Sequence, residues 1–97
     1  MINLESEYLK MLKDILNKNI PDFPVYLFGS RTTNTIKAFS DIDLIIMTNN
    51  NLPSDIVAQL TNEIDESNIP YKVDIVEWHL LSDSLKNSIQ KQFVKIQ

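Results

Sequence analysis

The sequence describes one small domain, and its composition excludes several classes of protein. The chain has 97 residues, of which 43% are hydrophobic and 23% charged, and its formal net charge is −4. It has no cysteine and one histidine, which excludes disulfide scaffolds, thiolate metal sites and multi-histidine zinc sites. The acidic balance disfavours direct binding to nucleic acid, because such binding needs a basic face. We therefore expect residues 1–97 to form a single domain.

The sequence contains no feature typical of a membrane or exported protein. Its longest apolar runs span a few residues, far short of the roughly 20 that cross a bilayer. The first residues do not combine a basic region with an apolar stretch, so no secretory signal is expected. We therefore expect a cytoplasmic protein with no membrane partner.

The first half of the chain predicts one helix and two strands. Residues 3–18 are expected to be helical, and Pro21 and Pro24 end the helix. Residues 25–28 form a short apolar strand, and residues 41–47 form a second, largely buried one. The helix is predicted because its apolar residues recur every three or four positions: Leu4, Tyr8, Met11, Leu12 and Ile15.

The second half predicts a helix, a strand and a last helix. The cluster Pro53-Ser54-Asp55 starts the first of these helices, and Pro70 ends it. Residues 71–77 form a third strand, and Ser82 could cap the last helix, with residues 93–96 as its end or as a short extended segment. The fold class is therefore α/β (α+β), with helices packed on a small mixed sheet.

The single glycine of the chain lies directly after the first predicted strand, in Gly29-Ser30-Arg31. A glycine there lets backbone N–H groups approach an anion, and a serine at a helix N-terminus adds a hydroxyl donor. An ordinary strand-to-helix turn with Ser30 as its N-cap explains the same residues. Arg31 is the only arginine; it could contact a phosphate or pair with a surface acid.

Two carboxylates share one face of the second predicted strand. Asp41 and Asp43 alternate with Ile42 and Leu44, so the two acids project together, roughly 6.6–7 Å apart along the chain. Like charges beside apolar residues repel each other, and a divalent cation between them removes that cost. Hard cations such as Mg²⁺ take one or two carboxylates together with phosphate oxygens and waters. The alternative is that both acids lie at a solvated strand end.

A third acid, Asp74, interrupts the last predicted strand. Val73 and Ile75 flank it and belong to the opposite face. If this strand lies beside the Asp41 strand, three carboxylates converge, and one or two metal ions could be held there for phosphoryl chemistry. The alternative is an Asp74 that faces solvent on an edge strand.

These residues resemble a known family. Gly29-Ser30, a ten-residue spacer and Asp41-Ile42-Asp43 resemble the Gly-Ser-x10-Asp-x-Asp signature of the DNA polymerase β nucleotidyltransferase superfamily. The chain is most similar to its minimal nucleotidyltransferases, the MNT or MntA-type antitoxins that pair with HEPN-domain toxins. The family usually has a second glycine where this chain has Asn34, and asparagine tolerates left-handed backbone angles, so the turn is expected to persist.

The resemblance implies a role for each motif. Gly29, Ser30 and Arg31 would bind the nucleotide, and Asp41, Asp43 and Asp74 would be the catalytic and metal-binding residues. It also implies two Mg²⁺ ions, ATP as substrate and a HEPN-domain toxin as partner. A hetero-oligomer is expected from it, with a homodimer as the alternative.

Three functions follow from these observations. The first is a Mg²⁺-dependent transfer of AMP from ATP to a hydroxyl of the partner, by the antitoxin of a HEPN–MNT pair. The second is a non-catalytic nucleotide- or metal-binding antitoxin that silences its partner by occlusion. The third is a plain α/β domain with a cation-binding acidic rim. We favour the first, because a chain without activity would have no reason to keep three unpaired carboxylates on apolar strands.

Overall fold

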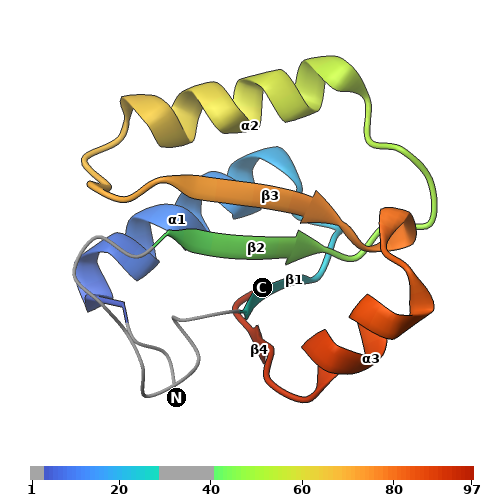
Figure 1. Cartoon of the computed structure of the whole chain (residues 1–97). Helices are drawn as coiled ribbons and strands as arrows, with labels where there is room; N and C mark the ends of the chain where they lie inside the picture. Colours follow the sequence, from blue (N-terminus) through green and yellow to red (C-terminus); the bar gives the residue numbers. More distant parts are fainter. Residues whose placement is uncertain (1–3, 29–40) are drawn as a thin grey trace.

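The helices and strands of the protein follow the predicted order. The computed structural model describes residues 4–28 and 41–97. Figure 1 shows a sheet with helices packed against it, as the predicted fold class requires. The elements are α1 (Ser6–Asn19), β1 (Val25–Phe28), β2 (Ile42–Ile46), α2 (Ser54–Glu66), β3 (Val73–Glu77), the 3-10 turn η2 (Trp78–Leu80), α3 (Asp83–Gln90) and β4 (Val94–Lys95).

The sheet is mixed, as the sequence predicts. Its strand order is β3-β2-β1-β4, with β1 antiparallel to both β2 and β4 and with β2 parallel to β3. Because parallel neighbours need a crossover connection, α2 joins the end of β2 to the start of β3. In Figure 1 the arrows of β2 and β3 point the same way, so the first residues of both strands lie at one edge of the sheet.

One face of the sheet carries the hydrophobic core. Alternate residues of β1 and β2 point to this face, and α1 and α2 cover it with leucines and isoleucines spaced at helical intervals. Burial of this kind stabilises the fold by roughly 25 cal/mol per Å² of apolar surface removed from water. The core residues of these four elements are fully or nearly fully buried: Leu12, Leu16, Val25, Leu27, Ile42, Leu44, Ile46, Leu60 and Ile64.

Three aromatic side chains pack together on the other face of the sheet, next to β1. The rings of Tyr26 and Phe93 stack with centroids 4.1 Å apart, and the Trp78 ring lies 6.3 Å from that of Phe93. The Lys86 ammonium lies 5.4 Å from the Trp78 ring centroid, a cation–π distance. These contacts join η2, α3 and β4 to the sheet.

The structure departs from the sequence prediction at the end of the chain. Ser82 caps α3 as expected, because its hydroxyl oxygen accepts a hydrogen bond from the Leu85 N–H at 3.2 Å. The helix ends at Gln90, however, and Phe93 leads into β4, which pairs with β1. The extended alternative for residues 93–96 is therefore confirmed for Val94–Lys95. None of the helices in the described ranges has the length and apolar character that a membrane span requires.

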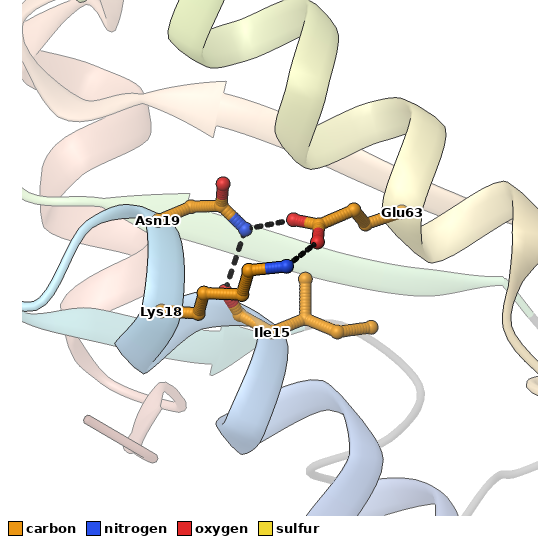
Figure 2. Close-up of polar contacts among 4 residues, drawn as sticks. All are labelled: Ile15, Lys18, Asn19 and Glu63. Atoms are coloured by element: carbon orange, nitrogen blue, oxygen red, sulfur yellow. Dashed lines mark hydrogen bonds and ion pairs between the residues drawn. The ribbon is translucent and has the colours of Figure 1, made fainter.

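A polar cluster joins the two core-covering helices. Glu63 of α2 accepts hydrogen bonds from the Lys18 ammonium, at 2.5 Å, and from the Asn19 amide of α1 (Figure 2). The Asn19 amide also donates to the Ile15 carbonyl at 2.9 Å. These donors, Lys18 first, hold the pKa of Glu63 below its ordinary value. Folding therefore favours the ionised form of the Glu63 carboxylate.

We expect Glu63→Gln to lower Tm at pH 7 and to have little effect on Tm at pH 3. Because the folded-state pKa of Glu63 is lowered, its stabilising contribution is present above the ordinary pKa and is lost as the pH falls through the folded value. Thermal unfolding followed by circular dichroism at both pH values measures this. Glu66→Gln, an exposed residue on the same helix, is the matched control. A Tm difference that stays the same at pH 3 would contradict the prediction.

Candidate active site

Two of the predicted site residues lie side by side on neighbouring strands. In the parallel pairing of β2 with β3, Asp43 is aligned with Asp74. Strands in a sheet lie about 4.8 Å apart, and aligned residues point to the same face. The neighbours Ile42 and Leu44 are fully buried in the core, so both carboxylates belong to the face that α1 and α2 do not cover. The predicted convergence is therefore present for this pair.

The third predicted acid lies at the same edge of the sheet. Asp41 directly precedes β2 and is exposed. It lies two residues before Asp43, the spacing that puts side chains of an extended chain on one face. Burial raises the pKa of Asp43 most, and charge repulsion from Asp74 and then from Asp41 raises it further, so both acids lie near Asp43.

Burial is the largest cause of the raised pKa of Asp43. Asp43 is only partly accessible, and the half-buried Phe28, the last residue of β1, is its aligned neighbour on the other side. An ionised carboxylate loses hydration when it is partly buried, so its protonated form is favoured. The predicted nucleotide-binding residues Gly29, Ser30 and Arg31 come next in the chain and lie outside the described residues.

A lysine contacts the acidic group, which consists of the side chains of Asp41, Asp43 and Asp74. The Nζ of Lys72 lies 3.6 Å from Oδ1 of Asp74, and its charge lowers the pKa of Asp43, against the effects of burial and of the two acids. Lys72 is not among the residues that the sequence predicts for the site. The signal was available, because Lys72 precedes Asp74 by two residues and so belongs to the same strand face.

The donor set of this site fits a hard divalent cation. Carboxylate oxygens are the ligands that Mg²⁺ prefers, and the mutual repulsion at Asp43 is relieved by a positive charge. Across residues 4–28 and 41–97 no three acidic or histidine side chains are close enough to form a ready-made metal site.

The family of the chain is shown by its similarity to known proteins. Residues 10–96 match the family described as "Polymerase beta, Nucleotidyltransferase". A curated relative from Haemophilus influenzae, described as "Probable protein adenylyltransferase MntA", is 36% identical over 98 residues, which cover 99% of this chain and 84% of the relative. The chain belongs to the polymerase β nucleotidyltransferase family. The predicted resemblance to MntA-type proteins and the predicted nucleotidyltransferase class of enzyme are both confirmed.

Solved structures of the family share this fold. One is a crystal structure of a toxin–antitoxin with AMP-PNP, at 26% identity and a TM-score of 0.74; the match covers 92% of this chain and 72% of that one. Another is a complex of the tri-AMPylated HEPN toxin of Shewanella oneidensis with MNT antitoxin. It has 22% identity and a TM-score of 0.69, and the match covers 97% of this chain and 72% of that one. The partner in that complex is of the class that the sequence analysis predicts.

His79 of this nucleotidyltransferase lies at the ends of β2 and β3 that are opposite to the acidic group. Its Nε2 lies 2.8 Å from Oδ1 of Asn51, and its Nδ1 lies 2.6 Å from Oγ1 of the buried Thr48. His79 therefore links η2 to the segment between β2 and α2. This is the hydrogen-bonding role that a lone histidine usually has, and His79 lies at the other end of the paired strands from Asp43 and Asp74.

We expect Asp43→Asn to raise Tm of the metal-free protein at pH 7 by about 2–5 °C, since 1 kcal/mol corresponds to roughly 4–8 °C in a domain of this size. The folded-state pKa of Asp43 is raised, so the stability that its proton supplies is present at low pH and is lost as the pH rises through the folded value. The amide removes the charge that repels Asp41 and Asp74. Thermal unfolding in EDTA tests this.

Asp22→Asn provides the control for this stability prediction. Asp22 is exposed in the turn between α1 and β1, and the same chemical change there should leave Tm unchanged within about 1 °C. A destabilised Asp43→Asn variant would show that the carboxylate at this position stabilises the fold, contrary to the argument from repulsion.

Proposed function

We propose that the protein is the antitoxin half of a HEPN–MNT pair and that it transfers AMP from ATP to a hydroxyl of its HEPN-domain partner with the help of Mg²⁺. The observation that supports this most directly is the alignment of Asp43 with Asp74, with Asp41 at the same edge of the sheet, in a chain of the nucleotidyltransferase family. The relative named as a protein adenylyltransferase and the complex with a tri-AMPylated toxin support AMP as the transferred group.

In this proposal the carboxylates bind the cation and orient the acceptor. Asp41, directly before β2, and Asp43, within β2, supply metal ligands. Asp74 supplies a further ligand or accepts the proton of the attacking hydroxyl. When bound, Mg²⁺ neutralises charge on the phosphates and lowers the pKa of that hydroxyl. Gly29, Ser30 and Arg31 are proposed to hold the triphosphate through backbone N–H groups, a hydroxyl and a guanidinium.

The proposed reaction is a displacement at the α-phosphorus of ATP. The acceptor oxygen forms a bond to the α-phosphorus, and the bond from this phosphorus to the oxygen that bridges to the β-phosphate breaks. Pyrophosphate leaves with the electron pair of the broken bond, and the hydroxyl proton passes to a carboxylate such as Asp74. The product is a phosphodiester between AMP and the partner.

The recognition of the acceptor is proposed to depend on the partner. A domain of 97 residues has little surface beyond the site itself. Asp41 is exposed and Asp43 and Asp74 are partly exposed, so solvent reaches all three acids. An acceptor carried on a docked protein reaches such a site without a substrate-binding domain. The AMP-PNP complex among the solved relatives supports an adenine nucleotide as the donor.

We expect Asp41→Asn and Asp43→Asn each to lower the rate of transfer by about a hundredfold or more, as removal of a group that stabilises transition-state charge does. The purified protein is incubated with its HEPN partner, α-labelled ATP and Mg²⁺, and the label on the partner is followed over time. Asp65→Asn, an exposed residue near the end of α2, is the control and should retain the wild-type rate.

The same variants separate transfer from occlusion. If silencing of the partner's toxicity requires transfer, the two variants should bind the partner and fail to silence it. Silencing that persists without label on the partner would overturn the catalytic proposal in favour of an antitoxin that acts by occlusion.

A further inference from the structure

Lys72 is anchored beside the acidic group by the backbone. Val73 is aligned with Ile42 across the parallel pair, so Lys72 precedes Val73 as Asp41 precedes Ile42. The carbonyl of Lys72 accepts a hydrogen bond at 2.8 Å from the N–H of Ile42, the residue between Asp41 and Asp43. The position of Lys72 at the start of β3 is thus fixed by the same ladder that aligns Asp43 with Asp74.

The side chain of Lys72 is free to leave its present contact. The Lys72 side chain is 70% exposed and that of Asp74 is 43% exposed. Exposed ion pairs contribute at most about 1 kcal/mol, because water competes for both charges and a long side chain loses freedom when held. The 3.6 Å contact between the ammonium and Oδ1 of Asp74 is therefore one that a stronger cation can replace.

Lys72 also differs from the lysines of the other ion pairs in the described ranges. Lys10 pairs with Asp14 within α1, and Lys18 pairs with Glu63 between the two core-covering helices. Neither acid belongs to the sheet. Lys72, in contrast, acts on both aligned carboxylates, by contact with Asp74 and through space on Asp43.

We propose that Lys72 is a positioning residue that serves as the counter-ion of the Asp43–Asp74 pair when the nucleotide site is empty, and that it competes with a divalent cation for these carboxylates. This inference rests on the proposed function and adds an order of binding to it. A divalent cation alone must displace the ammonium with two or three carboxylates as its protein ligands. A cation that arrives with a nucleoside triphosphate brings phosphate oxygens as further ligands, which offset that cost.

The direction of the expected effect distinguishes competition from a structural role. Loss of Lys72 removes a positive charge from the cation's site, so a divalent cation should bind more tightly. Two charges at 4–8 Å in water interact by about 1–2 kcal/mol when one of them is divalent, which predicts a change of about three- to tenfold after allowance for screening. A lysine that only supports the fold would give weaker binding when replaced.

The experiment measures binding of Mn²⁺ alone to the full chain without nucleotide. Free Mn²⁺ is followed by electron paramagnetic resonance for the wild-type protein, Lys72→Met and the control Lys10→Met. We expect the Kd of Lys72→Met to fall about three- to tenfold and that of Lys10→Met to stay at the wild-type value. The double variant Lys72→Met with Asp74→Asn should lose the gain, which assigns it to this pair.

An unchanged or higher Kd for Lys72→Met overturns the proposal, as does the absence of Mn²⁺ binding to both the wild type and this variant. Circular dichroism checks that the variant is folded, and Lys72→Gln replaces it if it is not. The transfer assay reports separately on the proposed function. Transfer with an unchanged Kd refutes only the role of Lys72, whereas a lower Kd without transfer refutes only the catalytic proposal.

Discussion

The parallel register of β2 and β3 is the constraint on which the acidic site depends. It aligns Asp43 with Asp74 on one face, while Ile42 and Leu44 pack on the other. Because side chains alternate along a strand, a shift of β2 by one residue would turn Asp43 into the core and Ile42 and Leu44 out of it. The apolar residues of the core thus determine which face of the sheet carries the carboxylates.

The alignment of the acids lowers the stability of the fold when no cation is bound. Asp43 is partly buried and has two acidic neighbours, so its charged form is disfavoured in the absence of a cation. Proteins keep such repulsion at functional sites and offset its cost elsewhere, here through the hydrophobic core on the other face of the sheet. Lys72 supplies part of the compensation locally, with a contact weak enough to be reversible.

Most of the fold and part of the site could be predicted from the sequence. The strands and the two core-covering helices have clear apolar periodicity, and alternation indicates that Asp41 and Asp43 share a face. That Asp74 lies on the same face depends on the pairing of β3 with β2, which the sequence left as a condition. The end of α3 could not be predicted, because Phe93 leaves the helical pattern to stack on Tyr26, a contact between residues far apart in the chain. For Lys72 the two-residue spacing to Asp74 is a weak signal, because a lysine beside a strand is usually solvated, and its contact with Asp74 is visible only in the structure.

The hydrogen bonds of His79 have a consequence for the register of the sheet. Through Thr48 and Asn51 they join the segment after β2 to the residues after β3, so the two parallel strands are linked at the end opposite to Asp43 and Asp74. A link there restrains the sliding of one strand along the other, which would separate the two aligned acids.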